Sequence, residues 1–204
     1  MKKYAVLHEP GDIVTLAGTR FVVLDVERRG SLPDSLFLLA LESVGASEFG
    51  SSNNYAESDL KKAVDKWLED MGKRGLDNAK LIPREIDLTT LDGSGCYGKL
   101  SVKAAPLTLD EAREYADIIP NAERWCWLAT GWSGPSKSDG DLALHVDSNG
   151  DWNYYGYCSV SNGIRPALKI PSDLLLDSAD KPDLSEVPTD TLLEEIRRRV
   201  ADKA

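Results

Sequence analysis

The fold is decided by three apolar runs, Trp125-Cys126-Trp127-Leu128-Ala129, Leu142-Ala143-Leu144-His145-Val146 and Ile164-Arg165-Pro166-Ala167-Leu168-Lys169-Ile170. Each run is short and rich in residues that favour extended backbone, which predicts three strands. The segments between them, 131–141 and 151–162, are polar and rich in Gly and Ser, and they predict two long loops. This part of the chain therefore predicts a sheet that carries long loops.

The N-terminal part of the sequence predicts further strands. Residues 13–16, 21–26 and 36–41 are β-rich runs, and short segments containing Gly or Pro separate them. Such spacing is typical of antiparallel neighbours, so we expect a meander.

Two helices are predicted between these groups of strands. Ser58 is suited to cap a helix in which apolar residues recur every three or four positions until Gly72. Thr108, with Glu111 three residues later, forms a capping-box pattern for a second helix that closes before Pro120. The sequence thus predicts an α+β fold.

The C-terminal segment has a different composition from the rest. Residues 171–188 are rich in Asp, Ser and Pro, and residues 191–203 have a capping box and one apolar side. We therefore divide the chain into a domain at 1–173 and, at 174–204, a linker with a short amphipathic helix. A helix of this length is marginal alone, so residues 191–203 are predicted to pack on something, through self-association or virion assembly.

Composition excludes several classes of function. The 204 residues carry a formal net charge of -10, which argues against binding to nucleic acid or to an anionic membrane. There is no apolar run long enough for a membrane span or a signal peptide. We expect a cytoplasmic location, or a virion-associated one.

Cofactor chemistry is not indicated either. Three widely spaced cysteines and two histidines are too few for a disulfide framework or a histidine-rich metal centre, so we expect no metal and no other cofactor. Residues 147–151 invite a calcium interpretation, but Trp152 and Cys158 stand where an EF-hand loop needs Gly and Glu. A turn at 147–150 is the prediction there.

Four pieces, in order, carry a family resemblance. They are the opening hairpin at 11–26, the Asn54-Tyr55 to Trp67-Leu68 segment, Trp125-Cys126-Trp127-Leu128, and Gly163-Ile164-Arg165-Pro166-Ala167-Leu168. Together they resemble an uncharacterised C-type-lectin-like domain family of bacteria and phages that ends in Gly-Val-Arg-Pro-Ala-Leu. The chain departs from that family at Ala129-Thr130, where Arg-Ser is usual, and at Lys61-Lys62, where an Arg is usual.

The resemblance implies a fold and a type of function. In a C-type-lectin-like fold, the N- and C-terminal strands pair, two helices pack on a mixed or antiparallel sheet, and long loops gather at one end. Some proteins of this fold are the variable proteins of diversity-generating retroelements, whose randomised positions form a binding face. The resemblance therefore implies a binding protein with its variable face near residues 132–162.

The binding residues are predicted from loop composition. Tyr, Ser, Asn and Gly dominate recognition loops because Tyr offers a large contact area at low entropic cost and the others adapt to a partner. We expect a protein or glycan ligand to be bound by Trp132, Ser136, Ser138, Asp139, Asp141, Asn153, Tyr154, Tyr155, Tyr157, Ser159 and Ser161.

Alternatives remain open at this point. Residues 151–162 could instead form a hairpin whose aromatic side chains cover the core, and Trp132 is suited equally to packing and to ligand contact. Trp125 and Trp127 are predicted to share one buried face of a strand, and Arg165 is predicted to be a buried, paired structural residue. The chain is predicted not to be an enzyme. An enzyme related to formylglycine-generating or sulfatase-modifying proteins, working through Cys126 and Cys158, is the alternative to a binding protein, as is a structural phage component.

Overall fold

The structure is a computed structural model that describes residues 2–4, 8–29, 32–137 and 139–178. Its elements confirm the α+β prediction: strands in antiparallel and mixed sheets are combined with two α-helices. The predicted linker-and-helix segment at 191–203 lies outside the described residues. No helix in the described part of the chain is long and apolar enough to cross a membrane.

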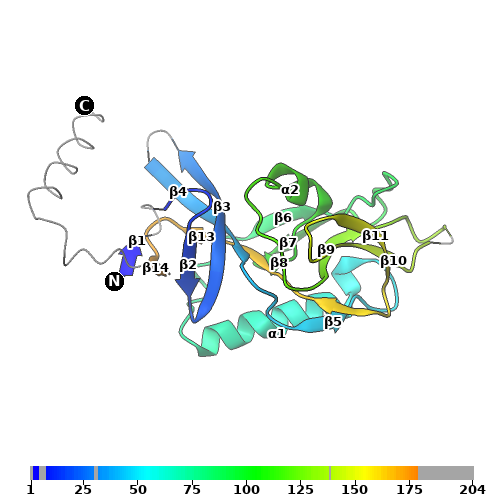
Figure 1. The fold of residues 1–204 in the computed structure, drawn as a ribbon, viewed down its shortest axis with the longest axis horizontal. Coiled ribbons are helices and arrows are strands. Elements are labelled where there is room, and N and C mark those ends of the chain that lie inside the picture. The colour runs from blue at the N-terminus through cyan, green and yellow to red at the C-terminus, as the bar shows by residue number, and fades with distance from the viewer. Residues whose placement is uncertain (1, 5–7, 30–31, 138, 179–204) are drawn as a thin grey trace, which may run out of the picture.

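A large antiparallel sheet forms one end of the molecule (Figure 1). Its order is β1-β14-β2-β3-β4-β13-β8. The bounds are β1 Lys2–Tyr4, β2 Ile13–Leu16, β3 Thr19–Arg29, β4 Leu32–Ala40, β8 Ala104–Ala105, β13 Ala167–Pro171 and β14 Leu175–Ser178. The three predicted N-terminal strands are β2, β3 and β4, and they form the predicted meander.

The sheet extends past the predicted domain boundary at residue 173. β14 pairs with β1 and β2, so the first and last described strands lie side by side. Residues 175–178, which were predicted as part of the linker, therefore form strand β14 of this sheet. The sequence did not predict this strand, because Asp, Ser and Pro dominate the composition around its Leu-Leu pair at 175–176.

A second, five-stranded sheet forms the opposite end (Figure 1). Its order is β11-β10-β9-β12-β5, with β9 and β12 parallel and the other neighbours antiparallel. The bounds are β5 Ala46–Glu48, β9 Cys126–Gly131, β10 Leu142–Val146, β11 Trp152–Tyr157 and β12 Ser161–Gly163. A small two-stranded sheet consists of β6 Arg84–Asp87 and β7 Lys99–Val102.

One of the two predicted long loops is wrong. Residues 131–141 connect β9 to β10 as expected, but most of 151–162 belongs to β11 and β12, joined by a short turn. The alternative, a hairpin within 151–162, is not formed either: β11 makes a hairpin with β10, whereas β12 pairs with β9 and β5. The aromatic residues of 152–157 favour extended backbone, and pairing with β10 satisfies their backbone groups.

Both helices begin where the sequence predicts. α1 (Asp59–Lys73) is capped by the Ser58 hydroxyl, which accepts from the Lys61 N–H at 2.9 Å. α2 (Leu109–Glu114) has the complete capping box of Thr108 and Glu111. A short 3-10 turn, η2 (Tyr55–Glu57), precedes α1. The residues between Glu114 and Pro120 are turns rather than a continuation of α2.

The core has two parts because both faces of β3 and β4 are covered. Phe21, Val23 and Leu38 pack with α1, whereas Val22 and Leu39 pack with α2 on the other face. Figure 1 shows the two helices on opposite sides of the molecule. Strands that are buried on both faces read as continuous apolar runs, which explains why these segments lack polar alternation.

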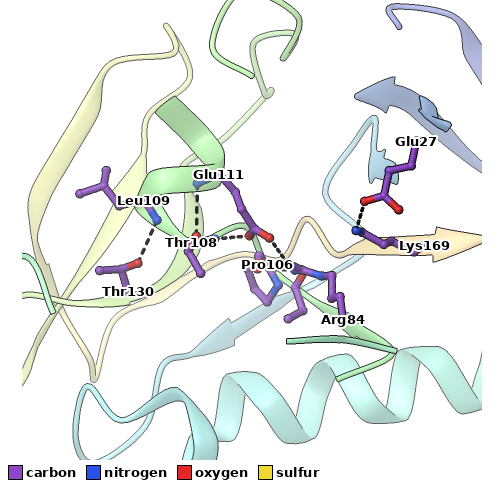
Figure 2. A network of polar contacts seen from close by, with 9 residues as sticks. Glu27, Arg84, Pro106, Thr108, Leu109, Glu111, Thr130 and Lys169 are labelled. Carbon is purple, nitrogen blue, oxygen red and sulfur yellow. Dashed lines mark hydrogen bonds and ion pairs between the residues drawn. The ribbon is translucent and has the colours of Figure 1, made fainter. Parts of the chain in front are cut away.

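A polar network fixes α2 between the small sheet and the second sheet (Figure 2). The buried Arg84 pairs with Glu111 and also donates to the carbonyl oxygens of Ala105 and Pro106, both at 3.1 Å. The Leu109 N–H donates to the Thr130 hydroxyl on β9 at 2.9 Å. These contacts hold the first turn of α2 against β9.

Candidate ligand-binding surface

Four of the predicted binding residues, Asn153, Tyr154, Tyr155 and Tyr157, belong to β11, at the edge of the second sheet. β11 has one neighbour among the described strands, β10, to which it is joined by a turn at 147–150. That turn was predicted, and its Gly150 has a φ of +88°, which side chains rarely adopt. At the other end of the hairpin, Tyr157 lies opposite Leu142.

The turn between β11 and β12 is held by one buried residue. The Cys158 N–H donates to the Asp141 carbonyl oxygen at 2.7 Å, and the Cys158 carbonyl accepts from the Gly50 N–H at 3.1 Å. The Val160 N–H closes the turn on the Tyr157 carbonyl at 2.9 Å. With Cys158 buried, its neighbours on both sides are turned outward.

Asn53 anchors the neighbouring loop 132–141. This side chain is 1% exposed, and its amide nitrogen donates to the carbonyl oxygens of Ser133 and Leu142, both at 2.9 Å. Its amide oxygen accepts from the Tyr97 hydroxyl at 2.6 Å. A Cβ at Gly131 would approach Asn53 to 2.8 Å, so glycine is required there.

A second contact fixes the outer part of the same loop. Lys137 forms an ion pair with Asp92, which also accepts from the Thr90 hydroxyl. These hydrogen bonds lower the pKa of the Asp92 carboxyl to about 2. The Asp92 N–H donates to the Trp132 carbonyl at 3.1 Å. The loop is thus held by residues of segments 50–58 and 90–98. The sequence did not predict this anchoring role of Asn53 and Asp92, because isolated Asn and Asp residues form no local pattern.

The predicted residues fall into three groups. Ser136, Asp141, Tyr157, Ser159 and Ser161 are exposed. Trp132 and Asp139 are half-buried, and Trp132 packs against the part of the core that contains α2. Ser138 and the side chains of Asn153, Tyr154 and Tyr155 lie outside the described residues. The structure brings Asp141 close to Tyr157 and Ser159, because its carbonyl accepts from Cys158, which lies between them, and Ser161 follows in β12 after the turn.

The exposed large apolar side chains of the described residues lie in or beside this sheet. In the described part of the chain they are Tyr157 (59% exposed), Trp125 (48%) and Val160 (47%), which lie in β11, just before β9 and between β11 and β12. Val160 was not predicted. Asp141, Tyr157, Ser159, Val160 and Ser161 are called the β11–β12 surface below.

The prediction that Trp125 and Trp127 are both buried is half wrong. Trp127 is 1% exposed, and its indole N–H donates to the Ser47 carbonyl at 2.9 Å. Trp125 stacks on His145 with ring centroids 4.8 Å apart, and the other face of its indole is exposed to solvent. The alternation of the strand is as expected, but Trp125 precedes β9, where the covering elements end.

His145 is buried between these two indoles. It is 1% exposed, and neither ring nitrogen has a hydrogen-bond partner among the described residues. Burial lowers the pKa of this imidazole below its ordinary value, partly opposed by Asp147. The neutral ring is therefore favoured at neutral pH.

The buried cysteines are poorly suited to nucleophilic chemistry. Burial raises the pKa of Cys126 to about 11 and that of Cys158 to about 12. Thiolate, the reactive form, is thus strongly disfavoured at neutral pH. Within the described residues, no group of three or more His, Cys, Asp or Glu side chains is placed to hold a metal ion.

Comparisons with protein-family models, with curated proteins and with solved structures find no match for this chain.

Proposed function

We propose that the chain is a recognition protein of C-type-lectin-like fold that binds a protein or glycan target through the β11–β12 surface. The observation that carries the proposal is the exposed Tyr157–Val160 turn on a buried Cys158 anchor. Exposed Tyr and aliphatic side chains surrounded by Ser and Asp match the composition of binding surfaces.

Two further features support the fold in this proposal. The first and last described strands pair, and one helix packs on each face of the large sheet. The loop 132–141 and the β11–β12 turn lie at the end of the molecule opposite those strands (Figure 1). A scaffold with its connecting segments gathered at one end is the arrangement expected of such a domain.

The rigid support also favours binding. Asn53, Tyr97 and the pair Asp92–Lys137 fix the loop beside the surface before any ligand arrives. Preorganisation of this kind lowers the entropic cost of association. The raised pKa values of Cys126 and Cys158 count against the alternative of an enzyme that works through these thiols.

The binding test uses two matched variants of the full chain. A glycan array and a display library of peptides are screened with the wild type, with Tyr157→Ala/Val160→Ser, and with Glu85→Ala, an exposed change on β6. Any specific target should lose about ten-fold or more in affinity with the double variant and be unaffected by Glu85→Ala. Specific targets that bind the double variant as tightly as the wild type would contradict the proposed surface.

The proposal includes diversification by a retroelement, with residues 132–162 as the variable window. It requires an adenine-substituted near-copy of the DNA encoding this window, next to a reverse transcriptase gene. Sequencing the genomic neighbourhood tests it: a neighbourhood without either element refutes diversification and leaves the binding proposal standing.

A further inference from the structure

A cavity lies at the other end of the β10–β11 hairpin, away from the β11–β12 surface. Its volume is about 240 Å³. It opens between three parts of the chain: α2 and the segment after it, strand β9, and the turn of the β10–β11 hairpin. The apolar part of its wall is formed by Leu39, Leu107, Ala112, Leu128 and Val146. At about 30 Å³ for each water in the liquid, the space suits a small organic molecule.

The hairpin turn forms the rim of this cavity. Asn121 and Gly150 both line it, and they touch closely: a Cβ at Gly150 would come within 2.6 Å of the Asn121 side-chain oxygen. Asp151 also lies at the rim, where it is exposed. Water screens a charge in that position, so Asp151 does not set the electrostatics of the interior.

The charged group in the wall is Arg165. It is 6% exposed; its Nε donates to the Ala40 carbonyl at 3.0 Å and its Nη1 to the Pro120 carbonyl at 3.1 Å. The prediction that Arg165 is buried is confirmed, but the partners of this predicted paired residue are two neutral backbone carbonyls rather than a carboxylate of the described residues. However, Nη2 has no partner among the described residues.

The guanidinium also has no carboxylate beside it in the described part of the chain. Both of its protein partners are neutral carbonyls, and burial lowers the pKa of Arg165. A buried cation without a counter-ion is costly. A buried donor that bonds to nothing adds to that cost. Because Arg165 lines the cavity, an anion bound there would supply the missing counter-ion.

We propose that this cavity binds a small monocarboxylic acid with an apolar body. The carboxylate pairs with the Arg165 guanidinium, which belongs to the cavity wall, and the body of the ligand lies against Leu107, Leu128 and Val146. The apolar walls select a carboxylic acid over inorganic phosphate, which has no apolar part. This site is separate from the β11–β12 surface and does not depend on the proposed recognition function.

The first experiment compares ligands by calorimetric titration of the full chain. Benzoate and hexanoate are the probes. Benzamide is the uncharged analogue of benzoate, and inorganic phosphate is an anion without an apolar part. Benzoate or hexanoate should bind saturably at or below about 10 mM, with benzamide and phosphate about ten-fold or more weaker. Absence of carboxylate binding at that concentration, or equal binding of benzamide or phosphate, would overturn the proposal.

The second experiment places the site with variants whose fold is checked by circular dichroism. Arg165→Met should abolish benzoate binding, whereas Arg124→Met, which removes an exposed arginine nearby, should leave it unchanged. Because Arg165→Met also removes contacts to Ala40 and Pro120, Ala112→Leu serves as a second variant that fills the cavity and keeps the arginine. A folded Ala112→Leu protein that binds benzoate like the wild type would refute the assignment.

Discussion

The two sheets have similar apolar strands but different surroundings. In the large sheet, β3 and β4 are covered on both faces, by α1 and by α2. In the second sheet, β9 is buried along its whole length, but β11 is an edge and the turn after it carries exposed Tyr157 and Val160. Aromatic residues in the first sheet therefore stabilise the fold, whereas some of those in the second are available for contact.

This difference shows that the hydrophobic pattern of a strand does not reveal which other elements pack over it. Trp125 and Trp127 lie on the same face by alternation, yet one is 48% exposed and the other 1% exposed. Other elements bury a strand by packing over it, and those that pack over the second sheet end at β11 and at the start of β9. Four predictions test this contrast, from the largest expected effect to the smallest.

Truncating a core aromatic in the large sheet should have the largest effect. Phe21 is fully buried and packs near Trp67 with ring centroids 6.4 Å apart. Phe21→Ala should lower the free energy of unfolding by about 3–5 kcal/mol, because it removes apolar burial and leaves a cavity. Urea denaturation measures the change, and a loss below about 1 kcal/mol would show that the large sheet is not the main core.

Removing the anchor of the loop 132–141 should have an intermediate effect. Asn53→Ala leaves the carbonyls of Ser133 and Leu142 without their donor, which should cost about 1–3 kcal/mol. Hydrogen exchange should show the greatest loss of protection in 132–142. Ser51→Ala, at an exposed position two residues away, is the control; uniform loss of protection across the chain would contradict a local anchoring role.

His145 should make stability depend on pH. In the unfolded chain the imidazole binds a proton near its ordinary pKa of 6.5, but burial lowers its pKa in the fold. The unfolded state thus binds more protons just below that pH, so stability is full above it and falls as the pH decreases toward the folded pKa. His145→Phe, which keeps a flat ring between Trp125 and Trp127, should remove this loss.

The measurement is the free energy of unfolding of the wild type and His145→Phe at about pH 7 and about pH 5.5. The stability of the wild type relative to that of the variant should be lower at the more acidic pH. Equal pH dependence in the two proteins would show that His145 is protonated as easily in the fold as in the unfolded chain.

Truncation at the exposed surface should have the smallest effect. Tyr157→Ala should change the free energy of unfolding by no more than about 0.5 kcal/mol, because the side chain is 59% exposed. Thermal denaturation beside Phe21→Ala gives the direct comparison. A loss on the scale of the Phe21 variant would mean that Tyr157 belongs to the core and would remove the basis of the proposed binding surface.

Several parts of this fold were determined by the sequence itself. The predicted strands at 13–16 and 142–146, and the helix starts set by Ser58 and Thr108, appear in the structure as expected. Hydrophobic period, capping groups and turn residues are local properties, and they act over a few neighbouring positions. The exposure of Tyr157, Ser159 and Ser161 was also predicted, from the polar composition around them.

Tertiary structure alone decided the rest. Pairing with β10 and β2 made strands of β11 and β14, in segments predicted as a loop and a linker. The contacts of Asn53 with the loop 132–141, and of Arg84 with α2, join residues far apart in the chain. The cover that separates Trp127 from Trp125 also comes from distant elements. The sequence determined which residues favour a strand or a helix, because that depends on near neighbours; which faces are buried, anchored or left open depends on the whole fold.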